Sequence, residues 1–103
     1  DYLKAIAGQG FQKPIFVTRK KGGFIASQSF PFEIFAFVIE GQIDIGIGGI
    51  KSSYLSGDTF YLAPNQTHSQ SFGSNGVKYL ASYKGADVQT ELELEQIAQN
   101  ETN

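Results

Sequence analysis

The side chain best suited to chemistry is His68, the only histidine among the 103 residues. An imidazole can donate, accept or exchange a proton near neutral pH, so His68 is a candidate polar anchor or general acid/base. The sequence has no cysteine, which excludes thiol catalysis, disulfides and zinc knuckles. Ser69 and Ser71 lack a nearby base and an orienting acid in any recognised order. A hydrolase triad is therefore not expected.

Composition and charge exclude several classes of partner. The net charge is -2, and the basic residues are few and scattered apart from residues 19–21. Nucleic-acid binding needs a basic stripe that displaces counterions from phosphates, so no nucleic-acid partner is expected. No apolar run reaches the roughly 18 residues of a membrane-spanning helix, and no signal peptide is visible. We expect a cytoplasmic protein without a membrane partner.

The elements that must position His68 are predicted from hydrophobic periodicity. The expected strands span residues 14–18, 24–29, 34–39, 42–47, 50–55, 59–62, 68–72 and 77–83. Gly48-Gly49 predicts a two-residue hairpin turn, since both turn positions favour positive φ. Short strands with turn signals every 8–12 residues indicate an all-β sandwich or barrel, and periodicity alone does not choose between them. We expect one domain, 1–103, with its core at about 13–84, a short helix or turn at 2–7, and a tail or short helix at 88–103.

The run at 34–39 is apolar on both faces, which is typical of a buried strand. Alternate side chains share a face. The set small enough to line a barrel interior is Ile34, Ala36 and Val38. The bulky set is Phe35, Phe37 and Ile39. The bulky face needs a cover, which we expect to be a second sheet or another subunit, and this predicts a homodimer.

Residues 57–68, Gly-Asp-Thr-Phe-Tyr-Leu-Ala-Pro-Asn-Gln-Thr-His, resemble the second motif of the cupin superfamily. Residues 35–41, Phe-Ala-Phe-Val-Ile-Glu-Gly, resemble the end of its first motif. Asn65 stands where glycine is common, and asparagine also tolerates left-handed φ. The resemblance covers about residues 24–83. It implies a double-stranded β-helix, the jelly-roll barrel, in a protein that commonly dimerises.

The resemblance also shows which metal ligands are missing. The first cupin motif normally supplies His-x-His and then a glutamate, and these positions fall on Gln28, Phe30 and Ile34. A catalytic transition metal usually needs three or more protein ligands. We therefore expect a degenerate metal site and no cofactor, with His68, Glu33 and Gln28 as the set if a divalent metal binds. Glu33 is one residue out of place, so it would need a bulge to point inward.

Two kinds of function remain open for a chain of unassigned biochemical role. Apolar residues at former ligand positions predict a pocket for a small, partly apolar molecule, with a polar anchor. The ligand-binding residues expected are His68, Gln28, Phe30, Ile34 and Tyr61. The alternative is a cupin enzyme of dioxygenase or isomerase type, with or without a metal, in which His68 is the catalytic residue.

Overall fold

Six strands form one antiparallel sheet in residues 1–85, the part of the chain that the computed structural model describes. The tail expected at 88–103 lies outside the described residues. The strands are β1 (Ile15–Arg19), β2 (Phe24–Gln28), β3 (Glu33–Ile47), β4 (Ile50–Leu55), β5 (Thr59–Leu62) and β6 (His68–Lys84), preceded by the helix α1 (Tyr2–Ile6). No helix in this part of the chain is long and apolar enough to cross a membrane.

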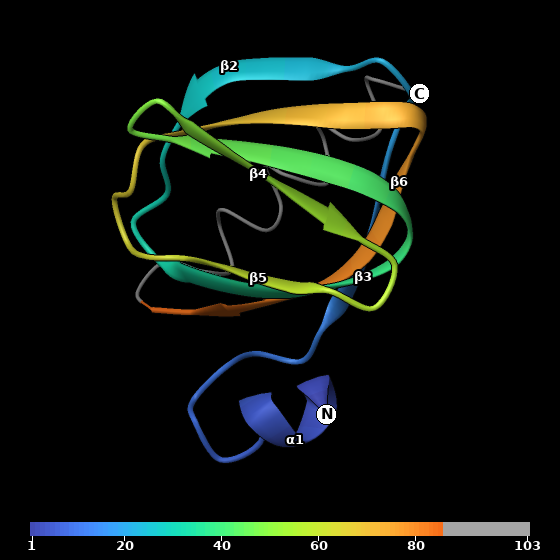
Figure 1. Ribbon diagram of the computed structural model, residues 1–103. Helices are drawn as coiled ribbons and strands as arrows, with labels where there is room; N and C mark the ends of the chain where they lie inside the picture. Colours follow the sequence, from blue (N-terminus) through green and yellow to red (C-terminus); the bar gives the residue numbers. More distant parts are fainter. Residues whose placement is uncertain (86–103) are drawn as a thin grey trace.

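The long strands β3 and β6 run side by side through the whole barrel (Figure 1). The first part of β3 pairs with β5 and its second part with β4. The first part of β6 pairs with β2 and its second part with β1. One face of the barrel is therefore β1-β6-β3-β5 and the other is β2-β6-β3-β4. This is the jelly-roll arrangement that the resemblance to the cupin superfamily implied.

The prediction of four short strands in place of β3 and β6 is wrong. Residues 73–76, expected to form a loop, lie within β6. The pairing of β3 with β6 shifts register between Val38 and Glu40 and again between Gly41 and Ile43. Bulges of this kind bend a strand without ending it, so each long strand passes from one face of the barrel to the other.

The hydrophobic core lies between the two faces. Ile34, Ala36 and Val38 are buried as predicted, and Ile43 and Ile45 continue the same inward row along β3. The predicted hairpin is also present, with φ of 57° at Gly48 and 84° at Gly49. The two-residue period of the pattern therefore identified the inward face of β3 correctly.

The cover of the bulky face comes in part from the same chain, which the sequence prediction did not include. The Tyr2 ring lies 5.2 Å from the Phe35 ring and 5.8 Å from the Phe37 ring. Its hydroxyl donates to the backbone oxygen of Phe35 at 2.8 Å. Helix α1 is itself capped by Asp1, whose carboxylate accepts from the Lys4 amide at 3.0 Å. The predicted N-terminal helix is thus confirmed, and it packs against the outside of the barrel (Figure 1).

Candidate functional site

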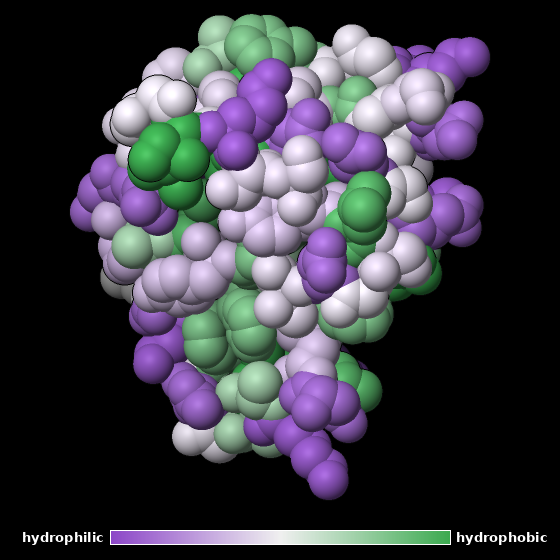
Figure 2. All heavy atoms as spheres, viewed as in Figure 1, coloured by the Kyte–Doolittle hydropathy of each residue, from purple (hydrophilic) through white to green (hydrophobic). Residues whose placement is uncertain are grey.

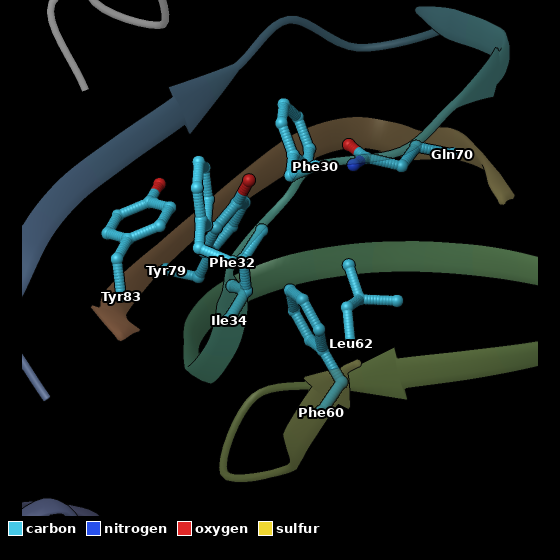
Figure 3. Close-up of a pocket in the computed structure, with 8 residues that line it drawn as sticks. All are labelled: Phe30, Phe32, Ile34, Phe60, Leu62, Gln70, Tyr79 and Tyr83. Atoms are coloured by element: carbon cyan, nitrogen blue, oxygen red, sulfur yellow. The ribbon is translucent and has the colours of Figure 1, made fainter. Parts of the chain in front are cut away.

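A small cavity lies inside the barrel, and aromatic rings make up most of its wall (Figure 3). Its lining residues are Phe30, Phe32, Ile34, Phe60, Leu62, Gln70, Tyr79 and Tyr83. The cavity has a volume of about 20 Å³. That is room for about one water molecule. We call this space the interior cavity.

Stacked rings occupy the position where the resemblance placed metal ligands. The rings of Phe30 and Phe32 are stacked, with centroids 5.3 Å apart and planes 18° from parallel. Phe32 also meets the edge of Tyr83, at 5.2 Å between centroids. The other lining residues are buried, whereas Phe30 is half-buried. Phe30 therefore lies where the interior cavity comes nearest to solvent.

The connection that carries Phe30 joins β2 to β3. Its backbone is fixed, since the Phe30 carbonyl accepts from the Asn65 amide at 2.6 Å. Asn65 has φ of 61°, the left-handed conformation that asparagine tolerates. The loop of the second motif thus positions the backbone beneath Phe30, and the phenyl ring projects from that fixed point.

His68 is buried beside the cavity, with 3% of its surface exposed. Its Nδ1 lies 3.0 Å from the backbone oxygen of Gln66, and its Nε2 lies 3.2 Å from the side-chain nitrogen of Gln70. A carbonyl oxygen only accepts, so Nδ1 donates to it, and in the neutral form of the imidazole Nε2 accepts from Gln70. Both ring nitrogens therefore have partners inside the protein.

Gln70 is the polar residue that the sequence reasoning missed. It lines the interior cavity, and 5% of its surface is exposed. Its Oε1 atom is buried without a hydrogen-bond partner within residues 1–85. A signal was available, because Gln70 is two residues after His68 and alternate residues of a strand share a face.

Two tyrosines supply the other polar atoms of the cavity wall. Burial raises the pKa of the Tyr79 hydroxyl, and the nearby Arg19 guanidinium opposes that rise. Burial also raises the pKa of Tyr83, to which the neighbouring Tyr79 adds. Both hydroxyls are therefore neutral near pH 7, and the cavity wall carries neutral polar atoms among apolar rings.

The prediction that Tyr61 lines the pocket is wrong. Its surface is 49% exposed, and its hydroxyl donates to Glu33 Oε1 at 2.8 Å on the outside of the barrel. This hydrogen bond is the main cause that raises the pKa of Tyr61. The neighbouring residues Phe60 and Leu62 point inward instead. Successive side chains of a strand point to opposite faces of the sheet. An error of one residue in the predicted alternation therefore places every side chain of the strand on the wrong face.

Of the other predicted ligand-binding residues, two line the interior cavity and two do not. Phe30 and Ile34 line the interior cavity, as expected. Gln28 is half-buried and is the register partner of His68, on the adjacent strand β2. His68 reaches the cavity through Gln70.

These residues do not fit a transition metal. The four positions of the motif carry Gln28, Phe30, Ile34 and His68, and the Nε2 atom of His68 already accepts from Gln70. Glu33 stays outside, bonded to Tyr61. Within residues 1–85 no group of three or more His, Cys, Asp or Glu side chains could hold a metal ion.

The barrel is similar to solved structures, although the sequence matches no family model and no curated protein sequence. An RmlC-like cupin from Shewanella frigidimarina superposes with a TM-score of 0.63 at 17% identity, over 75% of this chain and 68% of that one. An uncharacterized protein with a double-stranded β-helix domain from Klebsiella pneumoniae gives 0.62 at 21% identity, over 72% and 67%.

A third similar structure is larger. The DMSP lyase DddQ from Ruegeria pomeroyi gives a TM-score of 0.64 at 16% identity, with 71% of this chain covering 38% of that protein. The common feature of these structures is a double-stranded β-helix barrel. The chain therefore has the cupin fold, as its two motifs indicated.

Proposed function

We propose that this cupin-fold chain binds a small, partly apolar molecule in the interior of its barrel. The observation that carries the proposal is the composition of the interior cavity, which is lined by aromatic rings and by Gln70, whose Oε1 atom is buried and unsatisfied within residues 1–85. Ligand sites are typically apolar, with a few polar groups that fix the orientation of the ligand. A buried acceptor without a partner is rare in a finished core and is common where a ligand or water completes it.

The size of the cavity requires that one ring move. An enclosed cavity that binds benzene measures about 150 Å³, far more than the interior cavity offers. Phe30 is the ring that can leave, because it is half-buried and lies outside the strands. Its stacking on Phe32 is worth about 0.5–1.5 kcal/mol beyond burial, which a bound ligand can replace. We infer that the Phe30 ring gates the site.

Binding is favoured over catalysis by the state of His68. A general base needs a free lone pair within reach of its substrate. In this chain Nδ1 carries a proton held by the Gln66 carbonyl, and Nε2 accepts from Gln70. These two hydrogen bonds suit a role in which His68 orients the side chain of Gln70. The similarity to the DMSP lyase is a similarity of fold. A shared fold does not imply a shared activity, so it gives no support for lyase activity in this chain.

The test compares binding of benzene-sized aromatic molecules to wild type and to Phe30→Ala by ligand-observed NMR. We expect Phe30→Ala to bind at least tenfold more tightly, since the gating ring no longer has to be displaced. Phe16→Ala is the matched control, because Phe16 is 53% exposed on the outside of the barrel and should not alter binding. If neither wild type nor Phe30→Ala binds any of these molecules, the barrel is not a ligand site.

A further inference from the structure

We propose that Gln70 selects the ligand, and that the ligand is a neutral aromatic or apolar molecule that presents a hydrogen-bond donor to Gln70 Oε1. This inference rests on the proposed function, since it concerns the same interior cavity. It goes further by naming the chemical group that the ligand must carry and the side chains that impose this requirement.

The first step is the orientation of the Gln70 amide. The Gln66 backbone oxygen lies 3.0 Å from His68 Nδ1 and can only accept, so the neutral imidazole carries its proton on Nδ1. The lone pair of Nε2 then faces Gln70 at 3.2 Å. Only the NH₂ end of the amide can meet a lone pair favourably, so the backbone of Gln66 sets the direction of the whole relay through His68. The carbonyl end of Gln70, a residue that lines the interior cavity, is left without a hydrogen-bond partner within residues 1–85.

The second step is the energetic consequence of that orientation. Gln70 is 5% exposed and its Oε1 has no partner within the described chain. A ligand without a donor would seal this oxygen in an apolar space and leave it unsatisfied. A ligand with a donor gains a hydrogen bond to this oxygen, whereas a ligand without one leaves the oxygen buried and unsatisfied. The difference in binding free energy corresponds to an affinity about tenfold higher for the ligand with the donor.

The third step excludes charged ligands. A carboxylate would bring negative charge against the lone pairs of Gln70 Oε1, and the Arg19 guanidinium near the cavity is already hydrogen-bonded to Tyr79. An ammonium group would have to leave water for a wall made of Phe30, Phe32, Phe60 and other apolar side chains, which is strongly unfavourable without a counter-charge. The chemistry of the cavity therefore fits a neutral hydroxyl or N–H group on an aromatic or apolar body.

The experiment uses phenol and fluorobenzene, which have nearly the same shape and differ in the donor. Affinities are measured by NMR titration for Phe30→Ala and for Phe30→Ala combined with Gln70→Leu. We expect phenol to bind about tenfold more tightly than fluorobenzene to the single variant, and the ratio to fall close to one in the double variant. The control is Phe30→Ala combined with Gln12→Leu, since Gln12 is an exposed glutamine. This variant should keep the tenfold ratio of phenol to fluorobenzene affinity.

The outcomes separate this inference from the proposed function. Equal affinity for the two probes in Phe30→Ala, or an unchanged ratio after Gln70→Leu, overturns the selection by Gln70 and leaves the ligand site standing. Binding of neither probe overturns both. A single water on Oε1 that both probes displace equally also overturns the selection. If Phe30→Ala does not fold, Phe30→Leu replaces it in the same comparison.

A second measurement tests the relay without any ligand. The chain has one histidine, so an imidazole ¹⁵N spectrum contains the signals of His68 alone. With the imidazole neutral, we expect the proton on Nδ1, both in wild type and in Gln70→Leu, because the Gln66 carbonyl determines it. A proton on Nε2 in wild type would turn the Gln70 carbonyl toward His68 and would overturn the inference.

Discussion

At the scale of single residues, the interior is organised by polar groups whose neighbours determine their state. His68 and Gln70 form a relay that begins at the Gln66 carbonyl, and Tyr79 and Tyr83 contribute hydroxyls that burial keeps neutral. None of these side chains has the exposure of an ordinary surface polar group. The ionisation of the Tyr79 and Tyr83 hydroxyls therefore affects the stability of the fold as well as any binding in the barrel.

This coupling predicts a loss of stability in alkali. Burial raises the pKa of Tyr79 and Tyr83 above the value of about 10 that tyrosine has in an unfolded chain. The unfolded chain therefore loses protons first, so the stabilisation is complete below pH about 10 and declines as the pH rises above it. Urea unfolding at pH 8 to 11 should show the decline, and Tyr83→Phe should make it shallower.

Tyr61→Phe is the control for the alkaline series. Its hydroxyl is on the outside of the barrel, where solvent screens its interactions, so the slope should change less than for Tyr83→Phe. Identical slopes for wild type, Tyr83→Phe and Tyr61→Phe would contradict the role assigned to buried tyrosine hydroxyls.

At the scale of elements, the barrel depends on two strands that bend where they cross from one face to the other. Gly41 has φ of 85° and Gly76 has φ of 74°. A Cβ atom at Gly41 would collide with the carbonyl oxygen of Gly76, so the backbones approach more closely than any side chain allows. This contact ties the bend of β3 to the bend of β6.

Gly41→Ala should therefore destabilise the barrel more than a positive φ alone explains. Gly48→Ala is the matched control, since Gly48 also has positive φ, at 57°, but has open space around its Cα. The left-handed conformation costs about 1–2 kcal/mol for a residue with a Cβ, and the collision at Gly41 should add about as much again. Chemical denaturation of both variants measures the difference, and equal losses of stability would contradict the importance of the crossing.

At the scale of the whole molecule, the surface mixes hydrophilic and hydrophobic side chains, as the face in Figure 2 shows. The outer side of β1-β6-β3-β5 carries a row in which Phe16 pairs with Leu80 and Leu80 pairs with Phe37. Helix α1 contacts Phe37 at one end of the row, whereas Phe16 at the other end is 53% exposed. The homodimer predicted from the sequence would place its interface on this outer side.

Light scattering at micromolar concentration tests the homodimer. We expect a dimer for wild type and a shift toward monomer for Phe16→Asp, because a charge in the row would lose its hydration on association. Phe24→Asp is the control, since Phe24 is 65% exposed on β2, which belongs to the other face. A wild-type monomer would refute the prediction.

The metal content of the purified protein is a further prediction at the scale of the whole molecule. Because Phe30 and Ile34 stand at two ligand positions and Glu33 points outward, we expect well below one iron, manganese, zinc or nickel per chain in protein purified without a metal-affinity tag. Elemental analysis measures this directly. A near-stoichiometric metal would require Glu33 to turn inward, and would favour the enzymatic alternative over the binding role.

The sequence by itself determined the local features of this protein. The alternation of β3 identified Ile34, Ala36 and Val38 as inward residues, and Gly48-Gly49 identified the hairpin. The spacing of residues 57–68 indicated the cupin barrel. The inward residues and the hairpin follow from periodicity and turn chemistry, which depend on neighbours along the chain, whereas the barrel was implied by the resemblance of residues 57–68 to the second cupin motif.

Only the tertiary structure decided how distant segments complete the site. It placed Tyr61 outside, because parity on a four-residue strand is settled by pairing with β3 and not by its own short pattern. It showed that Phe30 and Phe32 stack, and that the relay from Gln66 leaves Gln70 Oε1 without a hydrogen-bond partner within residues 1–85. Packing and hydrogen-bond satisfaction are set by residues that meet only after the chain folds, so no local pattern could specify them.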